Sequence, residues 1–262
     1  MSTFSFITVF SDFANDIRGN VSSVVLMENE KSDKELQAIA SDFNQPATTF
    51  LWETEERDTY YIRWFAPDAE IPLCGHGTFA ATAFLSQGST KKAYTFLYPG
   101  GTITGKTDEH GNCEITLAAI QDFDETPIPE VVREGLGVSV KQYFKTSGKH
   151  LVLLESEEEL QEMKPLFHRL RESDTFAYTV TAPGNHTDFV SRTLVPHVQQ
   201  LEDHATGSSH AVLVPFWAKK LDKTVLTALQ LSRRGGKFKC LYEQESVTLR
   251  ADYEILNKGT LV

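Results

Sequence analysis

The chain has 262 residues, 40% of them hydrophobic, and a formal net charge of −11 at pH 7. This length allows one large domain or two of ordinary size, and the hydrophobic content is sufficient for a buried core. The acidic balance argues against nucleic acid and membrane surfaces as partners, because phosphate groups are bound by clustered Lys and Arg.

The sequence predicts no disulfide framework, metal site or targeting segment. Its three cysteines, Cys74, Cys113 and Cys240, lie far apart, which is typical of a protein kept in a reducing compartment. The N-terminus has no basic region before an apolar run, and no stretch approaches the roughly 20 apolar residues of a membrane span. We therefore expect a cytoplasmic protein that binds no metal.

The first 65 residues predict strands and one amphipathic helix. Aromatic and β-branched residues favour strands at 4–10, 24–26, 48–52 and 59–65. Between the second and third of these strands, Ser32 and Glu35 form a capping box ahead of apolar residues at helical spacing. Pro46 predicts the end of this helix, since a proline disfavours helical backbone in the preceding residue.

The stretch Leu73-Cys74-Gly75-His76-Gly77-Thr78 is the most informative in the chain. It precedes residues that are apolar on nearly every side, which is typical of a buried helix. Glycines leave the N–H groups at a helix start uncovered, and the positive end of the helix dipole lies there. This pattern favours binding of a carboxylate or another anion.

The remainder of the chain predicts mostly strands. We expect them at 94–97, 102–104, 113–117, 143–146, 150–154, 176–181, 189–193 and from 240 onward, with a link at 122–129. Ser147-Gly148 predicts a hairpin turn. Ser156 and Glu159 predict a second capped helix, which Pro165 either breaks or restarts.

Three patterns recur in the same order at nearly constant separation, which predicts two similar halves. Arg63 to Pro67 is matched by Arg192 to Pro196, Cys74-Gly75 by Thr206-Gly207, and Gly100-Gly101 by Gly235-Gly236. We place the halves at 1–121 and 122–262 and leave open a return of the final strand to the first half. The two helix N-termini would then face one another across a cleft. The alternative is two unrelated strand-turn-helix passages.

The chain resembles the PhzF-like family, named for phenazine biosynthesis, within the wider diaminopimelate epimerase fold. The resemblance covers nearly the whole chain in order. It is carried by Cys74 to Thr78, by Gly19-Asn20, by Arg63 to Pro67, by Asp188 to Arg192, by Glu202 to His210, and by Arg234-Gly235-Gly236. Val21 replaces the proline of the family's Gly-Asn-Pro turn.

The resemblance implies an α+β fold with two pseudo-symmetric halves, each a mixed or antiparallel sheet wrapped around a central buried helix. It also implies a homodimer. Family members that resemble the phenazine enzyme are cofactor-free isomerases, which move a proton along a cyclic diene carrying a carboxylate. A glutamate does most of the acid/base work there, helped by a histidine and an aspartate that correspond to His76 and Asp203.

One departure from the family pattern affects catalysis. The family has Asn-x-Ser-Glu-Thr-x-Phe, whereas this chain has Asn44-Gln45-Pro46-Ala47-Thr48-Thr49-Phe50. Ala47 therefore stands where the glutamate belongs. Loss of a positioned general base typically slows a reaction by about 10²–10⁴-fold. Glu70 or Glu202 could replace the lost carboxylate, although nothing in the sequence requires this.

The candidate proton carriers each have a structural alternative. His76 could act as a base or a hydrogen-bond donor, or could be a structural histidine at a helix start. Asp203 could accept a proton or cap the turn, and His210, inside the second helix, is more readily structural. Cys74 could be a thiolate favoured by the helix start or a small buried hydrophobe.

Epimerases of this fold use a cysteine at each of the two helix starts. Thr206 occupies the second place here, and a hydroxyl without an activating base is a poor proton carrier. Two-base racemisation is therefore disfavoured, and a one-sided proton shift or dehydration remains open. We expect the substrate carboxylate to be held at Gly75, Gly77, Thr78, Thr206, Gly207 and Ser208.

Three functions are compatible with these features. The first is an isomerase-like enzyme that acts on a small carboxylate-bearing metabolite without a cofactor, through His76, Asp203 and Cys74. The second is a protein of the same family that has lost catalysis and retains a ligand-binding cleft, which Ala47 favours. The third is a scaffold or interaction protein, which the polar groups clustered at the predicted cleft disfavour.

Overall fold

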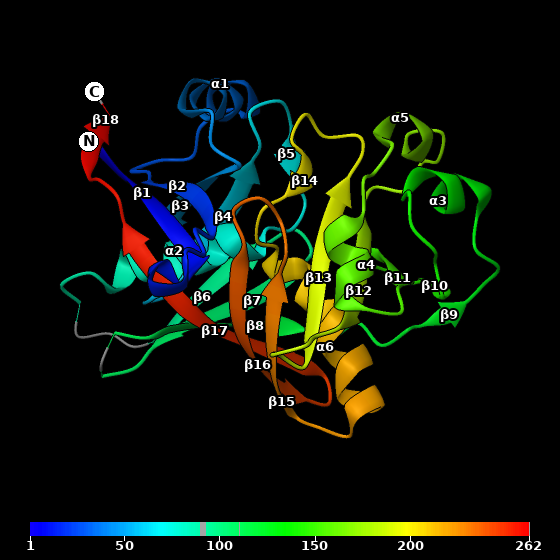
Figure 1. Ribbon diagram of the computed structural model, residues 1–262. Helices are drawn as coiled ribbons and strands as arrows, with labels where there is room; N and C mark the ends of the chain where they lie inside the picture. Colours follow the sequence, from blue (N-terminus) through cyan, green and yellow to red (C-terminus); the bar gives the residue numbers. More distant parts are fainter. Residues whose placement is uncertain (90–92, 110, 262) are drawn as a thin grey trace. The chain divides into compact units, whose positions relative to one another are not determined.

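The computed structural model describes residues 1–89, 93–109 and 111–261 and divides the chain into two compact units. Unit 1 comprises Met1–Leu117 and Thr248–Val262, and unit 2 comprises Ala118–Val247. The fold belongs to the mixed α+β class, with a few helices among many strands (Figure 1).

Unit 1 is a sheet that closes into a barrel. Hydrogen-bonded pairs run in the order β1-β2-β3-β4-β6-β7-β8-β17, and β17 pairs in turn with β1. Two short strands, β5 and β18, extend from β4 and β1. The strands are β1 (Ser2–Ser11), β2 (Asn20–Leu26), β3 (Ala47–Glu53), β4 (Thr59–Phe65), β5 (Glu70–Ile71), β6 (Ala93–Tyr98), β7 (Gly101–Thr107), β8 (Cys113–Ala118), β17 (Ser246–Ile255) and β18 (Gly259–Leu261).

Two helices of unit 1 pack on opposite faces of strand β3. Helix α1 (Asp33–Phe43) begins with the predicted capping box, because Ser32 Oγ accepts from the Glu35 N–H and the Glu35 carboxylate accepts from the Ser32 N–H. Its Leu36 and Ala40 join a core cluster with Phe50 of β3. Side chains alternate across a strand, so Ala47 and Thr49 point to the other face, toward helix α2. A single 3-10 turn (Phe13–Asn15) follows β1.

Helix α2 (Gly75–Ser86) contacts strands β1, β2, β3 and β7 of the barrel and is buried from its first residue through Ala83. This confirms the buried helix predicted from its apolar sequence. The helix approaches β7 very closely at Gly105, where an added Cβ would lie 2.0 Å from Thr82 Oγ1. Only glycine allows this contact.

Unit 2 contains a sheet whose pairs run in the order β9-β10-β11-β12-β13-β15-β16, with the short strand β14 on β13. The strands are β9 (Asp124–Glu125), β10 (Gln142–Lys145), β11 (His150–Leu153), β12 (Tyr178–Pro183), β13 (Phe189–Val195), β14 (Leu201–Asp203), β15 (Val225–Gln230) and β16 (Gly236–Glu243). The helices are α3 (Glu130–Gly135), α4 (Glu157–Glu162), α5 (Phe167–Leu170) and α6 (Gly207–Leu221).

The order and direction of strand pairing in unit 1 recur in unit 2. In unit 1, β2 is parallel to β3, β3 is antiparallel to β4, and β4 is parallel to β6. In unit 2, β11 is parallel to β12, β12 is antiparallel to β13, and β13 is parallel to β15. In each unit the long buried helix, α2 or α6, follows the short strand and precedes the second parallel pairing.

Helix α6 continues through a proline that would ordinarily interrupt it. Pro215 has no N–H, so the carbonyl of Ala211 loses the donor that a helix normally supplies. The N–H of Ile120 donates to this carbonyl at 2.8 Å. The proline is therefore tolerated because a segment outside the helix completes its hydrogen bonding.

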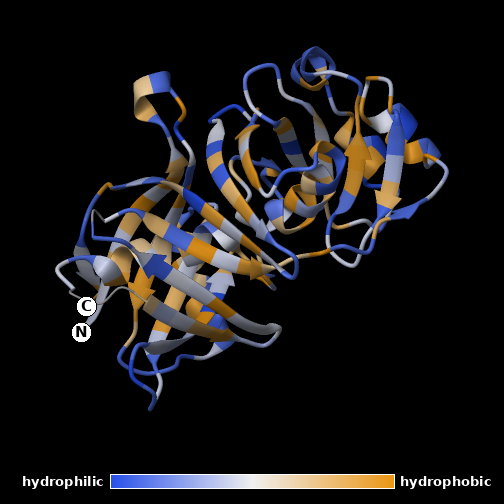
Figure 2. Cartoon of the chain, turned by 90° about the horizontal axis from the view of Figure 1, so that it is seen from below, coloured by the Kyte–Doolittle hydropathy of each residue, from blue (hydrophilic) through white to orange (hydrophobic). Residues whose placement is uncertain are grey.

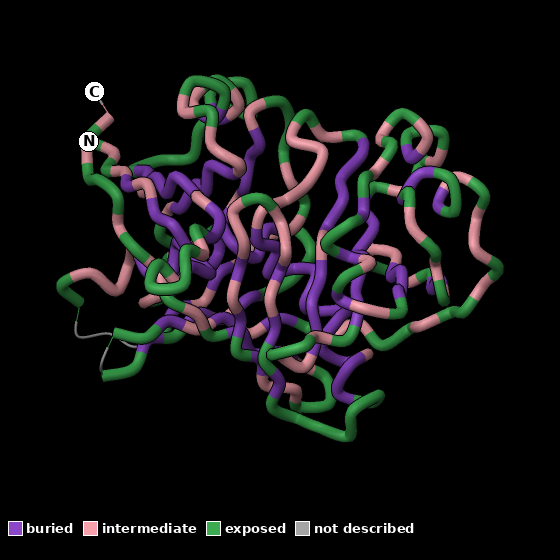
Figure 3. Tube along the Cα trace, viewed as in Figure 1, coloured by how far each residue is buried: buried purple, intermediate pink, exposed green. Residues whose placement is uncertain are grey.

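Burial follows the strands and the two long helices. Apolar residues run along the strands of each unit, whereas the turns are mostly hydrophilic (Figure 2). Buried residues likewise concentrate in the strands and exposed ones in the loops (Figure 3). Unit 2 has a core cluster that includes Tyr143, Val152, Leu160, Tyr178 and Leu194.

Candidate functional site

The start of α2 brings a thiol, an imidazole and a backbone N–H together. Cys74 is the N-cap residue, and its Sγ accepts a hydrogen bond from the Gly77 N–H at 3.4 Å. The same Sγ lies 3.4 Å from Nδ1 and 3.7 Å from Nε2 of His76. Both side chains are about 95% buried. A thiol and an imidazole in contact at a helix start can exchange a proton, as paired cysteine and histidine side chains do in nucleophilic sites.

Gly77 allows the helix start to approach the barrel wall. A Cβ at this position would lie 2.5 Å from Thr49 Oγ1, 2.6 Å from Trp64 Cδ1 and 3.1 Å from Cys74 Sγ. Thr49 Oγ1 also lies 2.9 Å from Ser22 Oγ, which in turn donates to the carbonyl of Ala47 at 3.1 Å. Ala47 is fully buried on the same face of β3 as Thr49.

Thr78, the third predicted residue with a side chain at the start of α2, forms its hydrogen bonds within the helix. Thr78 Oγ1 donates to the carbonyl of Cys74 at 2.8 Å, and the Thr78 N–H donates to the same carbonyl at 3.0 Å. The Thr78 hydroxyl is fully buried and its proton is engaged. Its direct effect is to fix the backbone of Cys74.

The start of α6 is organised by a buried glutamine on β15. Gln230 Oε1 accepts from the Thr206 N–H at 2.7 Å, and its Nε2 donates to the Asp203 carbonyl at 2.6 Å and to Thr206 Oγ1 at 3.0 Å. Thr206 is the N-cap residue, yet its hydroxyl makes no cap hydrogen bond to the helix. The two helix starts therefore differ, because Cys74 caps α2 and Thr206 is held by Gln230.

A lysine from the turn between β10 and β11 also reaches the start of α6. Lys149 Nζ donates to Ser208 Oγ at 2.7 Å. The next residue, Ser209, is fully buried and shares hydrogen bonds with Thr193 at 2.9 Å and Thr179 at 3.3 Å. The first turn of α6 is thus hydrogen-bonded to strands β12 and β13, and the ammonium group of Lys149 donates to its Ser208 hydroxyl.

His210 is a structural histidine. It is fully buried, its ring centroid lies 3.8 Å from that of Phe238, and its Nδ1 lies 3.0 Å from the Thr206 carbonyl. Burial lowers the pKa of His210 to about 4, so the imidazole is neutral at pH 7. Neutral Nδ1–H donates to the carbonyl, which agrees with the structural role favoured by the sequence.

Glu70 and Glu202, the two carboxylates considered as replacements for the missing glutamate, are engaged by arginines. Arg63 donates from Nε and Nη2 to Glu70, each at 2.8 Å, and Arg192 does the same to Glu202 at the same two distances. Each pair links a strand that precedes a proline-containing loop to the short strand that follows the loop. These are β4 and β5 in unit 1 and β13 and β14 in unit 2. All four carboxylate oxygens therefore accept from a guanidinium, which makes these groups poor proton carriers.

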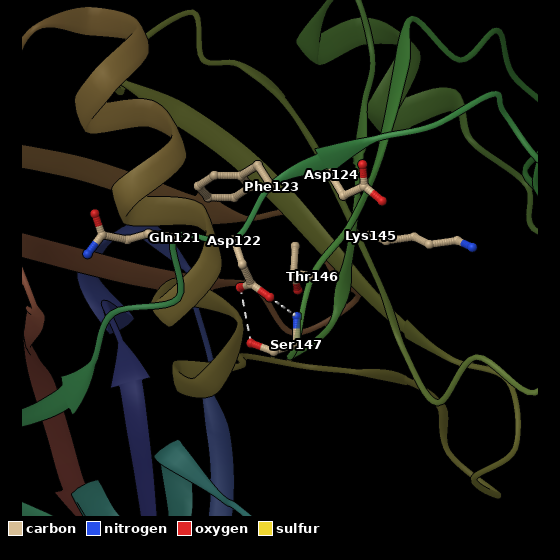
Figure 4. Close-up of a pocket in the computed structure, with 7 residues that line it drawn as sticks. All are labelled: Gln121, Asp122, Phe123, Asp124, Lys145, Thr146 and Ser147. Carbon is tan, nitrogen blue, oxygen red and sulfur yellow. Dashed lines mark hydrogen bonds between the residues drawn. The ribbon is translucent and has the colours of Figure 1, made fainter.

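A surface recess in unit 2 has none of the predicted site residues in its lining. It is lined by residues of the segment before and within β9 and of the β10 end, among them Asp122, Phe123, Lys145 and Ser147 (Figure 4). Both Asp122 oxygens accept from Ser147, at 2.7 Å from its N–H and 3.0 Å from its hydroxyl. With its acidic group engaged in this way, the recess presents no evident catalytic pair.

Within residues 1–89, 93–109 and 111–261, no cluster of three His, Cys, Asp or Glu side chains could hold a metal ion. In the same described part of the chain, no helix is long and apolar enough to cross a membrane.

The predicted site residues form two groups, one in each unit. Cys74, Gly75, His76, Gly77 and Thr78 lie at the start of α2, and Asp203, Thr206, Gly207 and Ser208 lie at the start of α6. The expectation that both starts face one cleft stays a prediction. Sequence reasoning missed Gln230 and Lys149. Gln230 follows Leu226 and Ala228 in an alternating buried pattern, which could have revealed the strand.

A family model described as "phenazine biosynthesis-like protein" matches residues 7–255, nearly the whole chain. The chain belongs to the PhzF family. It is 33% identical over 250 residues to an uncharacterized isomerase of Halalkalibacterium halodurans, covering 93% of both chains. A PhzF family protein of Enterococcus faecalis has a crystal structure that covers 99% of this chain and 98% of its own, with a TM-score of 0.86 and 29% identity.

The PhzF fold is shared with more distant proteins. A hydroxyproline epimerase of Agrobacterium vitis covers 98% of this chain and 91% of its own with a TM-score of 0.66, at 8% sequence identity. At this identity the likeness concerns the fold alone, which is thus of the epimerase and racemase type.

Proposed function

We propose that this PhzF-family chain is an isomerase that shifts a proton on a small carboxylate-bearing metabolite and needs no cofactor. The observation that carries the proposal is the contact of Cys74 with His76 and with the Gly77 N–H at a buried helix start. Relatives that bear the name isomerase support the same class of reaction. The general activity follows from the family, and the substrate class follows from the anion-binding character of the two helix starts.

The proposed reaction is a balanced proton shift. The Cys74 thiolate removes a proton from a substrate carbon and becomes a thiol, while the electron pair of the broken C–H bond moves into the adjacent π system. A proton from Asp203, or the same proton returned from Cys74, then adds to another carbon. His76 exchanges the proton with Cys74. The N–H groups of Gly75, Gly207 and Ser208, with the Thr206 hydroxyl, hold the substrate carboxylate, while the Gly77 N–H donates to Cys74 Sγ.

The thiol–imidazole pair takes the place of the family glutamate. Ala47, the counterpart of that glutamate, lies on the α2 side of β3, two residues before Thr49, which contacts Gly77. A methyl group cannot carry a proton, and Glu70 and Glu202 are both engaged by arginines. Cys74, His76 and Asp203 are therefore the proton carriers that we assign.

We also propose that the two units derive from one repeated unit and that α2 and α6 are its central helices. The recurring strand pairing supports this, as do the matching pairs Arg63–Glu70 and Arg192–Glu202. Assembly as a homodimer in the cytoplasm remains part of the prediction.

A second function is favoured by Ala47 itself. A PhzF-family chain without its glutamate could bind the same carboxylate and perform no chemistry. Under this ligand-binding function Cys74 only caps helix α2, and the groups at the start of α6 still bind the carboxylate.

Deuterium incorporation separates the two functions. A panel of small unsaturated carboxylic acids is incubated in D₂O with the protein and analysed by NMR and mass spectrometry. The isomerase predicts label at carbon, reduced by at least about 100-fold in Cys74→Ala. Binding without label would support the second function.

The Ala47 position provides a further test with a matched control. Ala47→Glu restores the family's carboxylate, and Ala47→Gln has the same size without a titratable proton. Under the ligand-binding function, only Ala47→Glu gains label. Under the isomerase function, the wild-type chain already incorporates label and both substitutions obstruct the site.

A further inference from the structure

The orientation of the Gln230 amide is fixed by two backbone groups. The Thr206 N–H can only donate, so the atom 2.7 Å from it is the carbonyl oxygen of Gln230. The Asp203 carbonyl can only accept, so the atom 2.6 Å from it is the amide nitrogen. Both assignments agree, and the side chain is 99% buried, which holds it in this one orientation.

This orientation determines the role of the Thr206 hydroxyl. The second hydrogen of Gln230 Nε2 points at Thr206 Oγ1, 3.0 Å away, so the hydroxyl oxygen must accept in that contact. Its own proton is then available to donate. Within the described residues, no acceptor for this proton is found among the contacts of Thr206.

The start of α6 also lacks the ordinary helix cap. An N-cap threonine usually accepts from an N–H of the first turn, and this Thr206 hydroxyl does not. At the other helix start, Cys74 Sγ does accept from Gly77. The first-turn N–H groups of α6 thus have no side-chain cap, and the contact with Gln230 turns the adjacent hydroxyl into a donor.

We infer that Gln230 is a positioning residue that sets Thr206 as a hydrogen-bond donor to a substrate carboxylate or to an oxyanion that forms on it. The inference rests on the proposed function and adds a residue to it. At the place where an epimerase of this fold has its second cysteine, this chain has a neutral donor whose polarity is imposed by a buried amide. The α6 side of the site therefore stabilises negative charge and does not remove a proton through Thr206.

The substitution Gln230→Glu reverses this polarity with almost no change in shape. An ionised carboxylate accepts from both the Thr206 N–H and the Thr206 hydroxyl, so the hydroxyl proton turns away from the ligand. When the carboxyl group takes up a proton at lower pH, one donor is restored. A merely structural role of Gln230 does not predict that ligand binding recovers as the pH falls.

The test uses formate, which stays ionised down to about pH 5.5, titrated into the full ¹⁵N-labelled chain and followed at the amide resonances of Gly207 and Ser208. We expect Gln230→Glu to weaken formate binding about tenfold at pH 8 and to recover part of it at pH 5.5. Thr206→Val should lower formate affinity by the same tenfold at pH 8 and at pH 5.5, whereas Thr206→Ser should bind formate as the wild type does. The double variant with Thr206→Val and Gln230→Glu should lose no more affinity than either single variant. Gln142→Glu on β10 is the matched control.

Two results would overturn the inference. One is equal formate affinity in the wild type and Thr206→Val. The other is a loss in Gln230→Glu that does not change with pH. Thr206→Val and Thr206→Ser both retain Gln230, so they decide the question even if Gln230→Glu does not fold. Formate binding without deuterium exchange on any acid would reject the isomerase and leave this inference standing.

Discussion

The sulfur of Cys74 lies 3.4 Å from Nδ1 of His76, within the first turn of a helix that is buried through nine of its residues. A thiol and an imidazole at this distance can pass one proton between them, and the Gly77 N–H stabilises negative charge on the sulfur. Neither group alone explains why the family's chemistry could continue without a glutamate at position 47. We propose that together they supply the base.

The reactivity of Cys74 should depend on His76. We expect iodoacetamide to modify Cys74 before the other two cysteines and expect His76→Asn to slow this modification several-fold, because the imidazole no longer removes the thiol proton. Peptide mass spectrometry follows each cysteine separately. Cys113 and Cys240 are internal controls, since burial raises the pKa of both thiols. Equal rates in the two proteins would show that the pair does not act together.

The contact between Gly105 and Thr82 should behave as a coupled pair. Gly105→Ala places a Cβ 2.0 Å from Thr82 Oγ1 and 2.8 Å from its Cγ2, so we expect a loss of about 1–3 kcal/mol in the free energy of unfolding. Adding Thr82→Ala removes both atoms and should return at least about 1 kcal/mol. Urea denaturation of the two single variants and the double variant measures the coupling. Strict additivity would contradict the contact.

The two arginine–glutamate pairs should differ in their contribution to stability. The Arg192 side chain is 13% exposed, and it also donates to the carbonyls of Leu160 at 3.3 Å and Met163 at 2.8 Å. Arg63 faces the more exposed Glu70 and Asp33. Lysine cannot reproduce a bidentate contact. We expect Arg192→Lys to lower the free energy of unfolding by roughly 2 kcal/mol or more, and Arg63→Lys by about 1 kcal/mol or less. Equal losses would contradict this account.

Stability should fall in mild acid because of His210. Its pKa in the folded chain is about 4, whereas the imidazole of an unfolded chain takes up a proton near pH 6.5. The unfolded state therefore binds more protons between these values, and the free energy of unfolding decreases as the pH falls from about 6.5 to 4, by up to about 3 kcal/mol. Denaturation at pH 7 and pH 5 should show a smaller difference in His210→Gln. His186→Gln, at an exposed position, is the control.

Local patterns in the sequence predict much of the fold. The capping box at Ser32 and Glu35, the buried helix that begins at Gly75 and the hairpin at Ser147-Gly148 are all confirmed. Each depends on interactions among residues close together in the chain, which is why sequence alone reveals them. The helix starts that carry the candidate site belong to this class.

Contacts between distant residues were not predictable in the same way. The sequence singled out Arg63 and Arg192, but their partners on β5 and β14 lie on strands too short to recognise. Gln230 lies on β15, a strand not predicted from the sequence, and its three hydrogen bonds join it to residues at least 24 positions earlier in the chain. Lys149 likewise reaches Ser208 only in the folded unit. Their importance depends on the geometry of the folded chain.

The interrupted hydrogen-bond ladder of α6 has a consequence for how unit 2 assembles. The carbonyl of Ala211 acquires its donor only when Ile120, near the beginning of the unit, has reached the helix. An isolated peptide of residues 207–221 would lack that donor and should be poorly helical in water. The hydrogen bonding of α6 is therefore complete only when the segment around Ile120 has docked on it. We expect the helix and this segment to form together in one cooperative step.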